Sequence, residues 1–325
     1  MLRWCSVRSS GIGQKLFLAF FIVITLGFGT WLNLSINKPG PLMQPADVVI
    51  PPHTKLLQTG ADLKAASVIN NEYLFAALAW ATGNKNKIKA GEYEFPADVT
   101  MWQVVSKMGR GEIVVRKVTF IEGWTVKQIV AELKNNPFLT GDITTPPAEG
   151  TLMPDTYTFT RGDTRASVIA RMQKEMEDFV ARHWAQRDPN YALKTPEEWL
   201  KLASIVEAET PKKDERARVA GVYLNRLAKP MRLEADPTVI YGLNGGAGPL
   251  GRALTLDDLK NPHAYNTYMH DGLPPTPINN PGKASLLAAL SPEKHNYYFF
   301  VADGTGGHTF ATTFEEHKQN RERLK

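Results

Sequence analysis

The chain has 325 residues, of which 43% are hydrophobic and 22% charged. This is ordinary globular usage, and it excludes a largely disordered or fibrous protein. The formal net charge is +5, but lysine and arginine are scattered rather than clustered, so we expect no nucleic acid partner. The length leaves room for one or two folded domains, and we expect two.

An apolar run near the N-terminus predicts a membrane anchor. Residues 16–34 carry no charge, and a helix needs roughly 20 such residues to cross a bilayer. Arg3, Arg8 and Lys15 precede the run, so the positive-inside rule puts the N-terminus in the cytoplasm and the rest of the chain outside. A cleaved signal peptide is the alternative. The apolar segment of a signal peptide would be followed by small residues at a cleavage site, whereas Trp31 and Leu32 lie near the end of this run.

These features divide the first part of the chain. We expect a cytoplasmic tail over residues 1–15, an uncleaved transmembrane anchor over 16–36 and a Pro-rich linker over 37–52. Cys5, the only cysteine, precedes the anchor, so no disulfide can form in the exterior part.

The next segment has the pattern of a small α+β module. Strands are indicated at 48–51, around Tyr93 and Phe95, and at 113–121; helical spacing covers 56–78, with a break at Gly60, and then 101–108 and 124–133. Two passes of strand then helix therefore lie between about 88 and 134. We assign residues 53–140 to this module.

A second, mixed α+β domain is expected over residues 141–325. Turn formers and aromatics fill 149–159, and a long helix covers 164–184. The next helix starts at the Thr195–Glu198 capping box and ends near Glu209, because Pro211 disfavours helix at Thr210. Later elements are a helix at 214–227, an irregular region at 229–282, strands at 297–302 and 308–311, and a terminal helix after Thr313.

The most chemically suggestive segment is LASIVEAET, residues 202–210. Its two glutamates, Glu207 and Glu209, lie at opposite edges of an apolar stripe at the end of a helix. Either can border a cleft in which apolar neighbours raise the pKa of a carboxyl group and make it a general acid. Helix geometry does not choose between the two, and both can instead be a solvated helix end.

Further motifs resemble one family. EGTLMPDTYTF precedes LASIVEAET, and VYLNRL, MRLEADPTVIYGL, AYNTY, GLPPTPI and GGHTF follow it. Over most of its length the chain closely resembles the endolytic murein transglycosylases, the YceG-like proteins. The resemblance implies that the first glutamate of IVExET is catalytic, here Glu207, with Glu209 in support. It also implies that the first module is LysM-like and binds glycan.

The implied reaction cleaves the β-1,4 bond between N-acetylmuramic acid and N-acetylglucosamine inside peptidoglycan strands without water, leaving 1,6-anhydromuramyl ends. One carboxyl group suffices, first as general acid and then as base. A muramidase-type glycoside hydrolase is the alternative; it needs a second carboxylate, for which Glu234 and Asp236 are available. A non-catalytic peptidoglycan-binding scaffold is a third reading.

We also expect a substrate site close to the glutamate helix, and the resemblance implies partners. The expected substrate-binding residues come from the stretch after the glutamate helix: Asn225, Asp236, Thr238, Tyr241, Tyr265, Asn266, Thr267 and His308. Each also has an ordinary structural explanation. No cofactor is expected, and no metal site, since the histidines are dispersed. Expected partners are peptidoglycan glycan strands, peptidoglycan synthases and the bacterial cytoplasmic (inner) membrane, with the catalytic domain on its outer side, where it would terminate nascent glycan.

Overall fold

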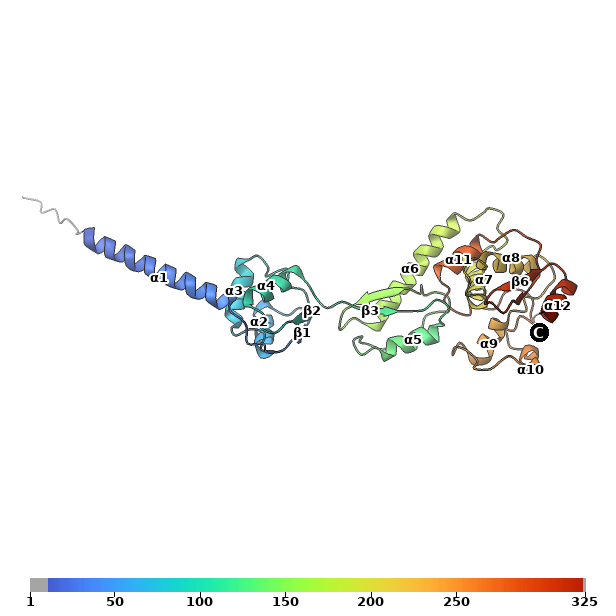
Figure 1. Ribbon diagram of the computed structural model, residues 1–325, viewed down its shortest axis with the longest axis horizontal. Coiled ribbons are helices and arrows are strands. Elements are labelled where there is room, and N and C mark those ends of the chain that lie inside the picture. Colours follow the sequence, from blue (N-terminus) through green and yellow to red (C-terminus); the bar gives the residue numbers. More distant parts are fainter. Residues whose placement is uncertain (1–10, 324–325) are drawn as a thin grey trace, which may run out of the picture. The chain divides into compact units, whose positions relative to one another are not determined.

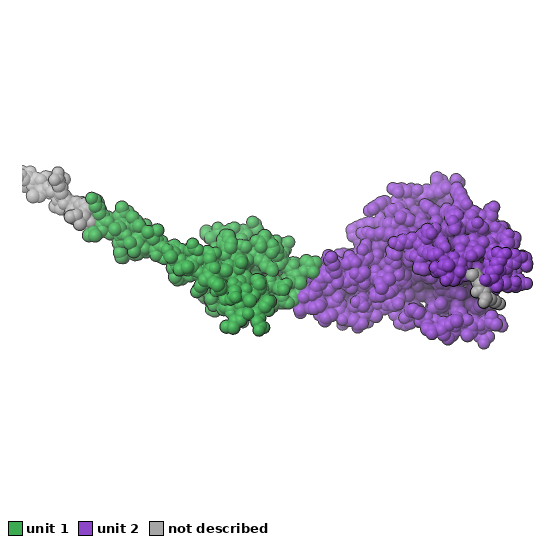
Figure 2. Space-filling view, viewed as in Figure 1, with its two compact units in different colours: residues 1–115 green, residues 116–325 purple. Residues whose placement is uncertain are grey.

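The computed structural model describes residues 11–323, and the chain forms two compact units, residues 1–115 and 116–325 (Figure 1, Figure 2). Most of the expected cytoplasmic tail, with Arg3, Cys5 and Arg8, lies outside the described residues. The architecture is α+β, with long helices and short antiparallel strand pairs.

The first helix, α1 (Gly11–Asn37), contains the expected apolar segment. Within the described residues, Gln14–Asn37 is the one helix long and apolar enough to cross a membrane, with a mean hydropathy of 1.9. Its large apolar side chains are exposed rather than packed against the protein. These properties suit a membrane anchor and also a signal sequence.

The first unit continues with a strand, two helices, a strand and a helix. Strand β1 (Ala46–Ile50) pairs antiparallel with β2 (Gly91–Phe95). Between them lie α2 (Leu56–Ala65) and α3 (Glu72–Ala81), and α4 (Met101–Arg110) follows. β1 lies within the segment expected to be a linker, 37–52, because Val48 and Ile50 face the core of this unit.

The interruption expected at Gly60 is absent, since α2 continues through this residue and ends at Ala65. Gly60 lies inside α2, where a Cβ atom would come within 3.0 Å of the carbonyl oxygen of Glu72 at the start of α3. The glycine therefore allows the two helices to approach closely. Asn71 caps α3 by accepting hydrogen bonds from the backbone N–H groups of Tyr73 and Leu74.

The second unit begins with a strand pair and two helices. β3 (Arg116–Thr119) pairs antiparallel with β4 (Thr156–Phe159), while α5 (Val126–Asn135) and α6 (Arg165–Ala185) bury an apolar cluster between them. The second strand–helix pass of the sequence therefore belongs to this unit. The chain divides after Val115, whereas we expected the module to extend to residue 140, because the pairing partner of β3 comes from later in the chain.

A second core in this unit surrounds three helices, α7 (Pro196–Glu209), α8 (Arg216–Leu227) and α11 (Lys283–Leu290). Trp199 is fully buried there, and its indole N–H donates to the carbonyl of Leu286 at 2.8 Å. The hairpin of β5 (Phe299–Ala302) and β6 (His308–Ala311), and then α12 (Phe314–Arg323), complete the unit.

The region expected to be irregular, 229–282, contains two short helices. They are α9 (Asp236–Asn244), which Gly245 ends in a left-handed conformation, and α10 (Leu256–Lys260). Our sequence interpretation did not predict α11, whose segment, KASLLAAL, is apolar on most sides of the helix. Such a helix lacks an amphipathic pattern because it is packed against both α7 and α8.

Candidate active site

The end of α7 directs its two glutamates to different surroundings. The expected capping box is present at the start of the helix, where the Thr195 hydroxyl accepts from the backbone N–H of Glu198 at 3.2 Å. Trp199, Leu202 and Val206 are fully buried. Because residues two apart on a helix point about 200° from each other, Glu207 and Glu209 leave the last turn on different sides.

Glu207 is held inside the protein by two partners. Its Oε1 accepts from Nη2 of Arg216 at 3.0 Å, and both side chains are nearly buried, at 6% and 5% exposure. Its Oε2 accepts from the backbone N–H of Gly282 at 2.9 Å. Glu207 thus links the end of α7 to the start of α8 and of α11. Glu122 extends this cluster, with Oε2 3.9 Å from Nη1 of Arg216.

Among residues 11–323, Glu209 has one hydrogen-bond partner, and its pKa is perturbed. It accepts from the Tyr223 hydroxyl at 2.7 Å. Burial raises the pKa of Glu209 from 4.5 to about 7, and the nearby Asp236 carboxylate also raises it. The Tyr223 hydrogen bond and the positive charge of Arg226 act in the opposite direction, but burial outweighs them.

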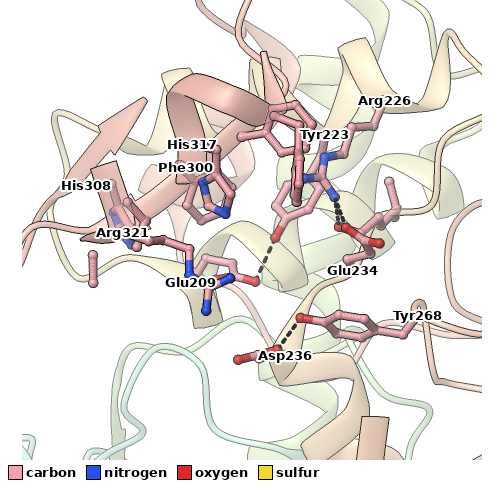
Figure 3. Close-up of a pocket in the computed structure, with 15 residues that line it drawn as sticks. Glu209, Tyr223, Arg226, Glu234, Asp236, Tyr268, Phe300, His308, His317 and Arg321 are labelled. Atoms are coloured by element: carbon pink, nitrogen blue, oxygen red, sulfur yellow. Dashed lines mark hydrogen bonds and ion pairs between the residues drawn. The ribbon is translucent and has the colours of Figure 1, made fainter. Parts of the chain in front are cut away.

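An open pocket of about 430 Å³ lies against Glu209, within the usual size range of ligand sites (Figure 3). Two further carboxylates line it. Asp236, at the start of α9, accepts from the Tyr268 hydroxyl at 2.6 Å, and Glu234 lies 3.2 Å from Nη1 of Arg226. The remaining lining residues come mainly from the C-terminal hairpin and helix: Leu233, Phe299, Phe300, Val301, Ala302, His308, Phe314, His317 and Arg321.

His308 reaches this pocket from the start of β6 and is held by a carboxylate. Its Nδ1 lies 2.9 Å from Oε2 of Glu215, whose Oε1 accepts from the backbone N–H of His308 at 3.2 Å. The ring packs edge-on against Phe300, with centroids 5.1 Å apart. These contacts fix both the strand and the imidazole. The Nδ1 contact leaves Nε2 available for another partner.

Among the expected site residues, Glu209, Asp236 and His308 therefore meet at one pocket. Asn225 does not line it; its amide donates to the carbonyls of His295 and Tyr297 and secures the segment before β5. Thr238 is fully buried, and its hydroxyl lies 2.9 Å from that of Thr267.

The other expected residues do not line the Glu209 pocket either. The Asn266 amide donates to the carbonyls of Leu259 and Asn261. Tyr265 and Tyr241 pack against each other, with ring centroids 4.8 Å apart, away from the lining of the Glu209 pocket. Within residues 11–323 there is no group of three or more His, Cys, Asp or Glu side chains arranged to hold a metal ion.

Our sequence interpretation missed Tyr223, Arg226 and Glu149. Glu149 accepts from the backbone N–H of Val126 at 2.8 Å and from the Asn280 amide at 3.0 Å, and burial raises its pKa to about 7. Only the polar residues within VYLNRL hinted at Tyr223 and Arg226. Their partners Glu209 and Glu234 lie on other elements, so spacing along the chain could not pair them.

Comparisons with known proteins agree with this architecture. The YceG-like family matches residues 48–323. A Bacillus subtilis protein named endolytic murein transglycosylase is 29% identical, over 85% of this chain and 84% of the relative. A Streptococcus pneumoniae protein of the same name is 25% identical over 84% of this chain, which spans 57% of that relative.

A crystal structure gives a similar result. The structure of a YceG-like protein from Listeria monocytogenes aligns with a TM-score of 0.52 and 32% sequence identity, covering 85% of this chain and 99% of that one. The family match covers both the first unit from β1 onward and nearly all of the second unit, including the pocket at Glu209. The chain belongs to the YceG-like family.

Proposed function

We propose that this protein is a lytic transglycosylase that cleaves the MurNAc–GlcNAc β-1,4 bond inside peptidoglycan strands, with Glu209 as its catalytic acid and base. The observation that carries the proposal is a partly buried carboxyl group with a pKa of about 7 at the wall of an open pocket. The name of the Bacillus and Streptococcus relatives supports the reaction class.

The proposed chemistry needs one group that gives and then takes a proton. Protonated Glu209 donates to the glycosidic oxygen as the bond to the anomeric carbon breaks. The resulting carboxylate accepts the proton of the muramyl 6-hydroxyl, whose oxygen attacks the same carbon and closes the 1,6-anhydro ring. A pKa of about 7 suits both steps, because neither protonation state is strongly disfavoured near neutral pH. Tyr223 orients the carboxyl group through its hydrogen bond.

The two glutamates of IVEAET therefore take different roles in this proposal. The family resemblance led us to expect catalysis at Glu207 and support from Glu209. Both oxygens of Glu207 accept hydrogen bonds, from Arg216 and from the backbone of Gly282, which suits a group that holds the end of α7 in position. The contacts thus favour the reverse assignment, with Glu209 reacting and Glu207 supporting.

A hydrolase remains the second candidate, because Glu234 and Asp236 line the same pocket as Glu209. In a hydrolase a second carboxylate would activate water or form a glycosyl-enzyme intermediate. Asp236 accepts a hydrogen bond from Tyr268, and Glu234 is paired with Arg226. These partners leave each carboxylate an oxygen that can serve such a role.

The proposal extends to the rest of the chain. The strand–helix–helix–strand order of the first unit supports a LysM-like, glycan-binding role. We further propose that α1 is an uncleaved, single-pass anchor in the cytoplasmic membrane, with the N-terminus inside and the chain after α1 on the outer side. This location would bring the enzyme to nascent strands and to peptidoglycan synthases, and would suit termination of glycan synthesis.

Mass spectrometry of reaction products tests the activity. The full chain in detergent micelles would be incubated with purified peptidoglycan, as wild type, Glu209→Gln and Glu207→Gln. We expect anhydromuramyl ends from wild type and none from Glu209→Gln. Reducing muramic ends would instead identify a hydrolase. Full activity of Glu209→Gln would refute the catalytic assignment, and no cleavage by folded wild type would refute the proposed function.

A further inference from the structure

A second pocket, of about 490 Å³, lies in the same unit and also borders the last turn of α7, at Ala208. The loop between β3 and α5 supplies Ile121 and Trp124, and α9 supplies Ile240 and Tyr241. The glycine-rich loop after α9 and Asn279 complete the walls. None of these residues lines the pocket of Glu209.

The walls combine aromatic rings with an exposed aliphatic side chain. Trp124 is partly exposed, and Ile121 is 57% exposed although it is large and apolar. Tyr241 is held firmly, since its hydroxyl donates to Glu149 at 3.2 Å and its ring packs on Tyr265. Fixed aromatic rings offer flat apolar surfaces that suit the C–H faces of a sugar ring.

One lining residue, Asn279, also carries an acceptor that is unpaired within the described part of the chain. Asn279 is 4% exposed, and its amide nitrogen donates to the carbonyl of Ser204 at 2.8 Å. Its Oδ1 is buried and has no hydrogen-bond partner among residues 11–323. A buried acceptor without a donor is costly and rare in proteins. An acetamido N–H or a hydroxyl group of a bound sugar would supply the missing donor.

The glycine loop is built before any ligand arrives. Gly246 and Gly248 adopt positive φ angles of 74° and 111°, which bring the backbone against the pocket without side chains. Asn244 fixes this loop, because its amide donates to the carbonyl of Gly248 at 2.6 Å and its Oδ1 accepts from the N–H of Gly246 at 3.0 Å.

The linings of the two pockets include residues that are consecutive in the chain. Ala208, which lines the second pocket, is exposed and lies in sequence between Glu207 and Glu209. On α9, Asp236 lines the first pocket and the next residue, Pro237, lines the second. The second pocket therefore begins one residue from Glu209 along α7, where Ala208 has only a small side chain.

From these observations we infer that the second pocket is a saccharide subsite, which binds an N-acetylated sugar unit of the strand whose neighbouring bond lies at Glu209. Trp124 and Ile121 contact the apolar face of the sugar, and Asn279 Oδ1 accepts from its acetamido or hydroxyl group. The assignment of this occupant rests on the proposed function. A subsite displaced from the reacting bond would favour cleavage inside strands over cleavage at their ends.

Binding can be measured apart from cleavage. The full chain carrying Glu209→Gln, in detergent micelles, would be titrated calorimetrically with β-1,4-linked N-acetylglucosamine oligomers of increasing length. Affinity should rise with length, and adding Trp124→Ala should weaken binding of the longest oligomers about tenfold, as for a moderate anchor residue. Ile121→Ala, at an exposed position that does not endanger folding, should weaken it severalfold. Leu287→Ala, an exposed aliphatic residue outside both pockets, is the matched control.

The outcomes separate the two proposals when cleavage of peptidoglycan by the wild-type protein is followed in parallel. If wild type produces anhydromuramyl ends but Trp124→Ala and Ile121→Ala bind long oligomers normally, the subsite is refuted and the catalytic proposal stands. If binding depends on Trp124 and Ile121 but wild type cleaves nothing, the saccharide site is supported and the catalytic proposal fails. If Trp124→Ala does not fold, the result with Ile121→Ala decides.

Discussion

Glu207→Gln and Glu209→Gln remove the same charge from the same turn of α7, yet we expect one to impair mainly stability and the other catalysis. Glu207 neutralises Arg216, and both side chains are nearly buried. Removing the charge leaves the Arg216 guanidinium without its close ionic partner, and breaking a buried pair in this way costs about 3 kcal/mol. Glu209 has no comparable ion pair with any residue that the structure describes, and glutamine can still accept the hydrogen bond from Tyr223.

The pKa of Glu209 makes its effect on stability depend on pH. The folded protein raises this pKa from 4.5 to about 7, so it binds the proton more tightly than the unfolded chain does. The associated stability is fully present below pH 4.5 and is lost as the pH rises through about 7. The loss is at most about 3 kcal/mol, at about 1.4 kcal/mol per pH unit. Glu209→Gln should remove this loss and make the protein relatively more stable at pH 8.

Thermal unfolding of the full chain at pH 5 and pH 8, together with product analysis, measures both effects. For a domain the size of the second unit, 3 kcal/mol corresponds to about 6–12 °C in Tm. We expect Glu207→Gln to lower Tm by about this amount. Glu209→Gln should narrow the difference in Tm between pH 5 and pH 8. The rate of glycan cleavage by this variant should fall about 100- to 10,000-fold, the usual contribution of general acid–base catalysis.

The opposite pattern would refute this reasoning. If Glu207→Gln kept the wild-type Tm and lost all activity while Glu209→Gln stayed active, the catalytic role would belong to Glu207, as the family resemblance first suggested. Glu197→Gln, at an exposed position in the first turn of α7, provides a control for the loss of one carboxylate from this helix.

Three further predictions concern the surroundings of the site. Tyr223→Phe removes a hydrogen bond that lowers the pKa of Glu209, so the basic limb of the kcat/KM–pH profile should move to higher pH; an unchanged limb would show that Glu209 is not the group being titrated. Glu215→Gln weakens the contact that holds His308. We expect activity to fall about tenfold, which corresponds to an increase of about 1.4 kcal/mol in the activation free energy, with little change in Tm. Kinetics equal to those of the wild type would argue against a role for His308 at the pocket. Gly221→Ala should lower the Tm of the second unit, because the new Cβ would lie 2.5 Å from the carbonyl oxygen of Glu293. Differential scanning calorimetry measures this Tm, and an unchanged value would contradict the prediction.

Local sequence signals predicted many individual elements. The capping box at Thr195 and the apolar stripe behind it predicted α7, and the turn between 302 and 308 predicted the terminal hairpin. The apolar run predicted α1. These features depend on residues close together in the chain, so periodicity and capping chemistry are enough to find them.

Elements that depend on distant neighbours were harder to predict. Gly60 suggested a break in the helix, whereas α2 continues through it, because the glycine allows the close approach of Glu72 at the start of α3. α11 is apolar nearly all round because α7 and α8 cover it, so no periodic pattern marks it. The division after Val115 depends on the pairing of β3 with β4, about 40 residues further along the chain.

The sequence by itself determined the family, the apolar N-terminal helix and the pair of glutamates at the end of α7. It could not distinguish the two glutamates, because they are chemically identical and symmetric about the apolar stripe. Only the tertiary structure separates them. It brings Arg216 and the backbone of Gly282 to Glu207, and it brings Tyr223 and an open pocket to Glu209. The pKa of a carboxyl group depends on such burial and on such partners, which the fold assembles from distant parts of the chain.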